Sequence, residues 1–278
     1  MQIVRTKKEL RQAIEDLRAT GKKIALVPTM GALHAGHISL VESAKTHAEG
    51  VVVSIFVNPT QFSPNEDLSK YPRTEEQDIA KLKAADAAIA YIPSVDEIYC
   101  DNAATTVHVE GISRELCGEF RQGHFDGVAT IVTKLLMQSL PDFAIFGEKD
   151  YQQLCVIRKL VEDLDINVEI IAAPTLREDD GLAMSSRNVY LDDEQRKIAP
   201  NLHKILQATA AGLRAGGEVE ELLAKAKEDL LEAGFNRIDY LELRDATTLK
   251  KASNLDKPTR LPAAVYLGKT RLIDNIGV

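Results

Sequence analysis

Short apolar runs alternate with amphipathic stretches along the first 171 residues of the chain. Apolar runs of four to seven residues predict buried strands, and apolar residues spaced three and four apart predict helices. The strands are expected at 24–27, 51–57, 87–92, 105–109, 143–146 and 168–171, and the helices at 6–19, 37–48, 74–85, 128–140 and 150–164. Apolar strands that alternate with helices are typical of a parallel sheet covered on both faces.

Local signals mark the ends of several of these helices. Thr6-x-x-Glu9 and Thr74-x-x-Gln77 each have the spacing of a capping box, in which two side chains satisfy backbone N–H groups at a helix start. Gly21 is expected to stop the first helix, because glycine adopts the left-handed conformation that ends many helices.

The alternation breaks at residues 174–188, where four consecutive charged residues (177–180) precede Gly181. We interpret this stretch as a hinge loop between domains. Beyond it, helices near 192–213 and 217–233 and strands at 238–243 and 264–267 predict a small α+β domain. We therefore expect a Rossmann-like, doubly wound parallel sheet over 1–175, a hinge with a mobile loop over 176–188, and a small C-terminal α+β domain over 189–278.

Composition narrows the class of protein. The 278 residues correspond to roughly two domains, and 45% hydrophobic with 27% charged residues is typical of soluble globular chains. No apolar run approaches the ~18 residues of a membrane span, and the N-terminus shows no secretory signal. Three cysteines without a C-x-x-C pair favour a reducing cytoplasm and disfavour a zinc site. The net charge of −8 argues against nucleic-acid binding but not against anionic substrates.

The strongest candidate site follows the first predicted strand. Residues 28–37 read Pro-Thr-Met-Gly-Ala-Leu-His-Ala-Gly-His and lead into a helix. Glycines let the backbone approach a phosphate, and a helix N-terminus favours negative charge. His34 and His37 could face one phosphate group, to donate hydrogen bonds or a proton. The alternatives are that the two histidines cap the helix or bind a stray metal ion.

Four further segments carry candidate chemistry at the expected ends of strands and helices. The amides of Asn58 and Gln61 suit a hydroxyl or carboxylate substrate, although an ordinary turn is the simpler explanation of that segment. The segments 121–128 and 147–153 place cations beside glycines, which suits an anion but is also found in solvated loops and helix starts. Two serines followed by Arg187 could bind a triphosphate.

These motifs together carry a resemblance to a known family. His34-Ala35-Gly36-His37 resembles the His-x-Gly-His signature of the adenylyl-transferring superfamily, which includes class I aminoacyl-tRNA synthetases, and the whole string 28–37 resembles the pantothenate synthetase (pantoate–β-alanine ligase) family. Four more stretches are similar to that family in the same order, namely Phe56–Phe62, Arg121–Phe125, Phe146–Gln153 and Met184–Arg187. Gln122 stands where the family usually has proline. The last ninety residues are similar mainly in length and position.

The resemblance implies a function and a set of residues. It implies the ATP-dependent condensation of (R)-pantoate with β-alanine to pantothenate through a pantoyl-adenylate, with release of AMP and pyrophosphate, by a cytoplasmic homodimer that uses Mg²⁺. The implied catalytic residues are His34, His37, Lys149 and Arg187, with His37 as the candidate proton donor. The implied ATP-binding residues are Met30, Gly31, His34, His37, Gly147, Lys149, Asp150, Leu176, Met184, Ser185, Ser186 and Arg187. Gln61 and Gln153 would hold pantoate, and Asn58 and His124 would lie near β-alanine.

Two other functions stay open on the sequence. A superfamily member could transfer AMP to a phosphate such as nicotinamide mononucleotide, and a nucleotide-sensing protein could keep the motifs without turnover. The charging of tRNA is disfavoured, because an acidic chain of 278 residues leaves no anticodon-binding domain. The protein ligands of Mg²⁺ are unknown from the sequence, and the acidic turn around Asp78 is a weak candidate.

Overall fold

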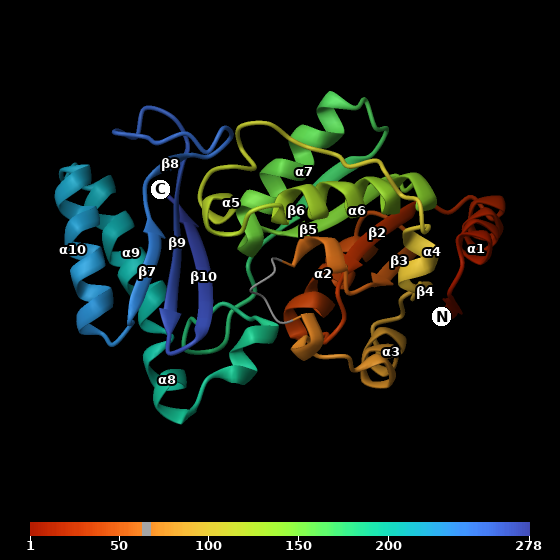
Figure 1. Cartoon of the computed structure of the whole chain (residues 1–278), viewed down its shortest axis with the longest axis horizontal. Coiled ribbons are helices and arrows are strands. Elements are labelled where there is room, and N and C mark those ends of the chain that lie inside the picture. Colours follow the sequence, from red (N-terminus) through yellow and green to blue (C-terminus); the bar gives the residue numbers. More distant parts are fainter. Residues whose placement is uncertain (63–67) are drawn as a thin grey trace.

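Two β-sheets lie side by side in the computed structural model, which describes residues 1–62 and 68–278 (Figure 1). The larger sheet has six parallel strands in the order β1-β4-β3-β2-β5-β6, and the smaller is antiparallel in the order β10-β9-β7 with β8 against β9. The strands are β1 (Gln2–Val4), β2 (Ile24–Thr29), β3 (Gly50–Ile55), β4 (Ile89–Tyr91), β5 (Phe143–Gly147), β6 (Glu169–Ala173), β7 (Arg237–Leu241), β8 (Arg244–Asp245), β9 (Thr259–Leu267) and β10 (Thr270–Gly277).

Helices cover both faces of the parallel sheet and the outer face of the smaller one (Figure 1). Around the parallel sheet they are α1 (Lys7–Ala19), α2 (Ala35–Lys45), α3 (Glu75–Ala84), α4 (Val95–Ile98), α5 (Cys117–Phe120), α6 (His124–Ser139) and α7 (Tyr151–Asp163). The C-terminal part contains α8 (Asp193–Ile198), α9 (Asn201–Arg214) and α10 (Val219–Glu232). The expected fold class, a doubly wound parallel sheet with a small C-terminal α+β unit, is confirmed.

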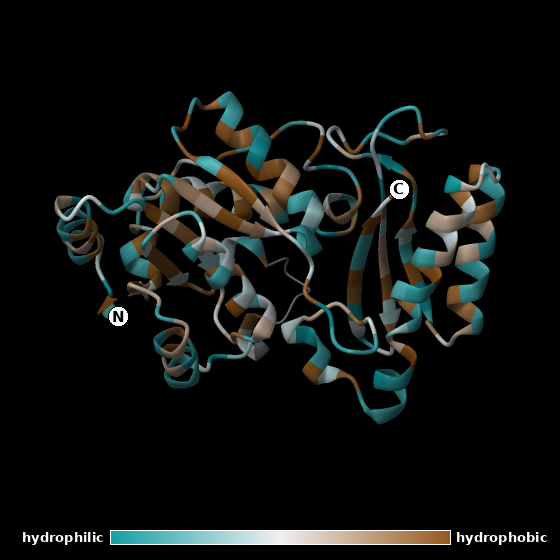
Figure 2. Ribbon diagram, turned by 180° about the vertical axis from the view of Figure 1, so that it is seen from behind, coloured by the Kyte–Doolittle hydropathy of each residue, from teal (hydrophilic) through white to brown (hydrophobic). Residues whose placement is uncertain are grey.

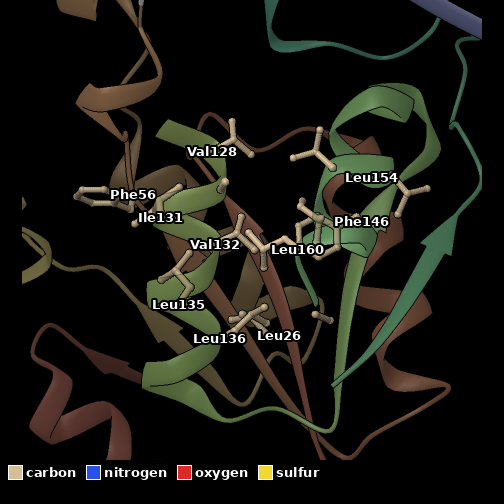
Figure 3. Packing of buried hydrophobic residues seen from close by; sticks show 14 of the residues in the cluster. Leu26, Phe56, Val128, Ile131, Val132, Leu135, Leu136, Phe146, Leu154 and Leu160 are labelled. Carbon is tan, nitrogen blue, oxygen red and sulfur yellow. The ribbon is translucent and has the colours of Figure 1, made fainter. Parts of the chain in front are cut away.

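Alternating residues of the central strands feed two separate cores. In β2, Leu26 packs in the cluster beneath α1, α6 and α7, whereas Ala25 and Val27 pack in the cluster beneath α2 and α3. This alternation is the two-residue period of a strand with both faces buried. Figure 3 shows the first cluster, in which Val132 and Leu136 of α6 point toward Leu26. Figure 2 shows that apolar residues concentrate along the strands of both sheets.

Several expectations about local structure were wrong. The strand expected at 105–109 is irregular, because the N–H of Val107 donates to the hydroxyl of Thr130 (2.9 Å) in place of a strand partner. The single helix expected over 192–213 is broken into α8 and α9, which meet at Pro200, a residue without a backbone N–H. Strands β1 and β10 were not expected from the sequence.

The two expected capping boxes differ in outcome. The box at Thr6 is confirmed, since its hydroxyl accepts from the N–H of Glu9 (3.2 Å) and the Glu9 carboxylate accepts from the N–H of Thr6 (3.0 Å). The box at Thr74 is wrong, because its hydroxyl donates instead to the carboxylate of Asp78 (3.2 Å). Asp78 serves the candidate site, as described below.

The chain passes from the larger sheet to the smaller one through residues 174–192. This passage follows β6, which ends at Ala173, and precedes α8. The domain limits at 175 and 189 stay a prediction. Within the described residues, no helix is long and apolar enough to cross a membrane.

Gly127, in the first turn of α6, offers a test of this packing. A Cβ at position 127 would lie 2.4 Å from the carbonyl oxygen of Thr60, in the turn after β3. We expect Gly127→Ala to lower the free energy of unfolding in urea by about 1–3 kcal/mol, the usual cost of forcing an extra methyl group into a packed contact. The matched control is Gly277→Ala, because a Cβ there meets no atom within 4 Å. Equal unfolding midpoints for the two variants would contradict the packing described.

Candidate active site

The turn between β2 and α2 lies at the carboxyl edge of the parallel sheet, where ligands bind in open α/β folds. Gly31 (φ +79°) and Ala32 (φ +49°) both have left-handed backbone conformations. The carboxylate of Asp78 in α3 is buried and accepts the N–H groups of Ala32 (2.9 Å) and Leu33 (2.8 Å). A buried carboxylate that accepts two backbone donors fixes the path of the turn. Asp78 is therefore occupied by the protein, and the weak expectation that it reaches Mg²⁺ is not supported.

The two histidines of this turn cap α2 reciprocally. The N–H of Gly36 donates to Nδ1 of His34 (3.1 Å), and the N–H of His34 donates to Nδ1 of His37 (3.3 Å). The ring centroids are 4.1 Å apart. Because Nδ1 of each ring accepts a backbone donor, we infer that each neutral ring carries its proton on Nε2. Capping the helix and donating to a phosphate are thus compatible, since the two tasks use different nitrogens.

Both imidazoles are held in the neutral form. Burial, followed by the positive charge of Lys149, lowers the pKa of His34 to about 4. Burial, followed by His34 and Lys149, lowers the pKa of His37 to about 3. Protonation of Nδ1 would also place two N–H groups against each other, because this nitrogen now accepts a hydrogen bond from a backbone N–H. At neutral pH each ring therefore offers an uncharged Nε2–H donor beside the Lys149 cation.

Lys149 lies in a short 3-10 turn, η3 (Glu148–Asp150), between β5 and α7. This turn is at the same edge of the sheet, because β5 is paired directly with β2. The Lys149 side chain is only 17% exposed, and its Nζ lies 3.7 Å from the carboxylate of Asp150. A largely buried ammonium group with one nearby carboxylate is suited to bind an additional anion.

The flap, which we define as residues 176–187, returns from the hinge to cover this edge. Arg177 and Ala183 form an antiparallel bridge, and the N–H of Met184 donates to the carbonyl of Leu176 (3.0 Å). Met184 lies against the histidine turn, since a Cβ on Gly36 would be 3.5 Å from the Cβ of Met184. The flap thereby reaches the turn between β2 and α2.

The end of the flap begins a second 3-10 turn, η4 (Ser186–Tyr190), which presents hydroxyl and guanidinium groups. The hydroxyl of Ser185 accepts the N–H of Arg187 (3.2 Å), and Ser186 hydrogen-bonds the hydroxyl of Tyr71. The charge of Arg187 acts on Asp150 of the Lys149 turn. The flap and the Lys149 turn therefore share one electrostatic environment.

A cavity of about 620 Å³ lies between the carboxyl edge of the parallel sheet and the smaller sheet. Seven of the residues expected from the sequence line it, namely His124, Lys149, Asp150, Gln153, Ser185, Ser186 and Arg187. The other expected residues are not part of its lining, namely Met30, Gly31, His34, His37, Asn58, Gln61, Gly147, Leu176 and Met184. Of these, His34 and His37 still interact electrostatically with Lys149 and Asp150 on the cavity wall.

Three of the four residues expected near pantoate and β-alanine, namely Asn58, Gln61 and His124, form a connected network. The amide of Asn58 is buried and bonds Gln61 (3.2 Å), the carbonyl of Gly127 (3.1 Å) and the hydroxyl of Tyr99 (2.8 Å). Gln61 in turn donates to the sulfur of Met30 (2.9 Å). Asn58 therefore positions its neighbours, whereas the short distance to Met30 brings Gln61 to the histidine turn.

His124 links the turn after β3, which contains Gln61, to the loop that precedes α6. Its Nδ1 donates to the carbonyl of Gln61 (2.8 Å), and the guanidinium of Arg121 contacts its Nε2 (2.9 Å). Of the two consecutive glutamines in α7, Gln152 is buried and accepts the backbone N–H of Cys117 (3.0 Å), whereas Gln153 lines the cavity and its side chain bonds no backbone group of the described residues.

Sequence reasoning missed the contribution of the C-terminal sheet. His203 of α9 and residues 269–275 of β10 and its preceding turn line the cavity. The sequence offered no signal for them, because isolated polar residues in a strand are usually solvated. One signal for the role of Asp78 was available, because its carboxylate lies on a face of α3 that is otherwise apolar. A charged group on such a face indicates a buried partner.

Fold and site together define a Rossmann-like α/β protein with a cavity, lined by Lys149 and Arg187, between its two sheets. Residues 2–277 match the model of the family described as Pantoate-beta-alanine ligase. The chain is 58% identical to the pantothenate synthetase of Paramagnetospirillum magneticum over 99% of this chain and 97% of that protein. The corresponding enzyme of Rhodospirillum rubrum is 52% identical, over 99% of this chain and 98% of that protein.

Solved structures agree with the sequence relatives. A pantothenate synthetase from Thermus thermophilus superimposes with a TM-score of 0.94 at 44% identity, covering 99% of each chain. A pantoate-beta-alanine ligase from Francisella tularensis, complexed with beta-gamma ATP and beta-alanine, superimposes with a TM-score of 0.80 at 38% identity, covering 99% of this chain and 97% of that one. The chain therefore belongs to the pantoate-beta-alanine ligase family, and it is a ligase.

The depressed histidine pKa values predict how stability depends on pH. In the unfolded chain histidine titrates near its ordinary pKa of 6.5, whereas in the folded protein the pKa of His34 is about 4 and that of His37 about 3. Between pH 6.5 and the pKa values of the folded protein, the unfolded state therefore binds more protons than the folded state. The contribution of these two groups to the free energy of unfolding is highest above about pH 6.5 and decreases as the pH falls toward 4.

The measurement is the free energy of unfolding in urea between pH 4 and 7 for the ligand-free protein. We expect His37→Gln to make the dependence on pH shallower than in the wild type, because one of the two groups no longer titrates. The matched control is His47→Gln, whose imidazole is exposed. Identical slopes for wild type and His37→Gln would contradict the neutral, buried state of this ring.

Proposed function

We propose that this ligase condenses (R)-pantoate with β-alanine to pantothenate, with ATP converted to AMP and pyrophosphate. The observation that carries the proposal is that Lys149 and the Ser185–Arg187 end of the flap line one cavity, while the two neutral imidazoles, outside its lining, interact electrostatically with Lys149 and Asp150. Uncharged N–H donors, one buried ammonium and two hydroxyls beside a guanidinium are the groups that bind a triphosphate. The Francisella tularensis relative, complexed with beta-gamma ATP and beta-alanine, supports the same assignment.

The first step forms a pantoyl-adenylate. A carboxylate oxygen of pantoate attacks the α-phosphorus of ATP, and the bond from that phosphorus to the β-phosphate bridging oxygen breaks to release pyrophosphate. Negative charge grows on the phosphoryl oxygens, so groups that donate to them lower the barrier. Lys149 and the Nε2–H groups of His34 and His37 supply these donors, and Arg187 with Ser185 and Ser186 stabilises the departing pyrophosphate.

This arrangement favours hydrogen-bond donation over proton transfer as the role of His37. Its pKa of about 3 keeps the ring neutral at pH 7, and the Nε2–H of a neutral imidazole is too weak an acid to transfer its proton. A neutral donor fixed by the helix cap needs no reorganisation when charge develops. The remaining ATP contacts are assigned to the backbone around Met30, Gly31 and Gly147 and to Leu176 and Met184, which flank the same turns.

The second step forms the amide. The amine of β-alanine attacks the acyl carbon of the adenylate, the bond from that carbon to the phosphate oxygen breaks, and AMP leaves while the amine loses a proton to solvent or buffer. We assign Gln61 and Gln153 to pantoate, and Asn58 and His124 to the positioning of this half of the site. The flap excludes water from an intermediate that water would otherwise hydrolyse.

Mg²⁺ is proposed to accompany ATP. It would bind mainly to phosphate oxygens, as this hard cation does in most nucleotide sites, and would neutralise part of the triphosphate charge. Asp150 is the carboxylate in the cavity wall beside Lys149 that could hold it. The described residues contain no group of three or more His, Cys, Asp or Glu arranged to hold a metal.

We extend three expectations from the family resemblance to this chain. They are a nucleotide- and pantoate-binding domain over residues 1–175, a C-terminal domain over 189–278 that closes over it, and a homodimer in the cytoplasm. The C-terminal residues in the cavity wall support the second of these.

The reaction is tested most simply by its products. After incubation with ATP, Mg²⁺, pantoate and β-alanine, mass spectrometry should show pantothenate, AMP and pyrophosphate in equal amounts, because one phosphoanhydride bond is broken per amide formed. Omission of pantoate should abolish pyrophosphate release. ADP in place of AMP, or a stable dinucleotide product, would contradict the proposal.

A second prediction concerns His37. We expect His37→Ala to slow pantoyl-adenylate formation in a single turnover by about a hundredfold, the scale for loss of one preorganised donor to a transition-state oxyanion. His37→Gln should recover part of that loss, because its amide nitrogen can still donate. His47→Ala, at an exposed histidine of the same region, is the matched control. A single-turnover rate unchanged by His37→Ala would remove this residue from the site.

A further inference from the structure

The turn that carries Lys149 is held by a residue of the C-terminal sheet. The side-chain nitrogen of Asn275 in β10 donates to the carbonyl oxygens of Glu148 (2.9 Å) and Lys149 (3.0 Å). Asn275 is 4% exposed, so water has little access to these two bonds. The turn after β5 is thereby fixed by a strand that lies 126 residues further along the chain.

A neighbouring cation fixes the orientation of this amide. Arg260, in β9, donates to Oδ1 of Asn275 (3.0 Å) and to the carboxylate of Glu148 (3.0 Å). Its guanidinium group also lies over the ring of Tyr151, 4.1 Å from the centroid. Because a guanidinium group only donates, Oδ1 of Asn275 must face Arg260 and its nitrogen must face the two carbonyls. Arg260 therefore fixes the orientation in which the Asn275 amide binds the Lys149 turn.

The preceding residue of β10 holds the base of the flap. The carboxylate of Asp274 is buried and accepts two hydrogen bonds from Arg177, at 2.7 and 2.9 Å. Arg177 also donates to the carbonyl of Gly181 (3.1 Å), which closes the hairpin that leads to Met184. Burial raises the pKa of Asp274, but hydrogen bonds from His203 and Arg177 outweigh this and lower the pKa overall. The charged form of Asp274 is thus the form that anchors the flap.

We propose that Asp274 and Asn275, which we call the β10 clamp, are positioning residues for the adenylation step. Consecutive Cα atoms are about 3.8 Å apart, so this dipeptide sets the distance between the Lys149 turn and the base of the flap. The N–H of Asn275 donates to the Asp274 carboxylate (2.7 Å), which couples the two contacts further. The side chains of the clamp bond Arg177, Arg260 and the carbonyls of the Lys149 turn, so the clamp acts through Lys149 and Arg187.

This inference rests on the proposed function, in which Lys149 and the flap bind one triphosphate. Under that function, a misplacement of either group by about 1 Å costs on the order of a hundredfold in rate. A role limited to stability would instead lower the melting temperature and leave the kinetic constants of the folded fraction unchanged. The two roles are therefore separable by kinetics.

The first test compares variants in β10. We expect Asn275→Ala to slow pantoate-dependent exchange of pyrophosphate into ATP by about 10–100-fold and to raise the KM for ATP, with the KM for β-alanine unchanged. Asn275→Asp, which has nearly the same size but no donating nitrogen, should behave similarly and serves if the alanine variant folds poorly. The matched control is Ile276→Ala, the next residue of the strand, which packs in the C-terminal core. Asn275 variants that match Ile276→Ala in all kinetic constants would overturn the proposal.

The second test asks whether the clamp acts through the residues it holds. The double variant Lys149→Ala with Asn275→Ala should exchange pyrophosphate no more slowly than Lys149→Ala alone. Likewise, Asp274→Asn with Arg187→Ala should exchange pyrophosphate no more slowly than Arg187→Ala alone. Losses that multiply in both pairs would overturn the clamp. If Lys149→Ala and Arg187→Ala themselves leave the exchange rate unchanged, the proposed function fails; if they slow it and the clamp variants do not, only the clamp fails.

Discussion

The buried carboxylate of Asp78 is the constraint on which the candidate site depends. It accepts two backbone N–H groups of a turn in which Ala32 has a left-handed conformation that is otherwise unfavourable for a residue with a side chain. That turn places His34 at the N-cap of α2 and His37 one helical turn later, where each ring accepts a backbone donor. A different path of the turn would break this reciprocal capping.

The histidines illustrate how a structural role and the proposed catalytic role can share one side chain. Capping uses Nδ1, burial removes the charge, and Nε2–H is left as a fixed neutral donor. The positive charge at this edge comes instead from Lys149 and from Arg187 of the flap. In the proposed reaction, hydrogen bonds from these donors become stronger as negative charge develops on the phosphoryl oxygens. They therefore stabilise the transition state more than the ground state, although the site has few formal charges.

The sequence predicted the parallel sheet because strands such as β2 and β3 are buried on both faces and read as continuous apolar runs. The resemblance supplied candidate residues, several of which do line the cavity. Contacts that depend on tertiary structure were not predictable. Val107 reads as part of a strand but bonds Thr130, and Asp274 and Asn275 read as ordinary polar residues although they are buried against Arg177 and the Lys149 turn.

The central claim is that one triphosphate lies between the two imidazoles, Lys149 and the end of the flap. A crystal structure with pantoate and an ATP analogue that has a methylene group between its α- and β-phosphorus atoms tests it most directly. The account predicts phosphate oxygens about 3 Å from Nε2 of His34 and His37, from the Lys149 ammonium and from the flap hydroxyls. Phosphates bound elsewhere, with both imidazoles facing only protein atoms or water, would contradict it.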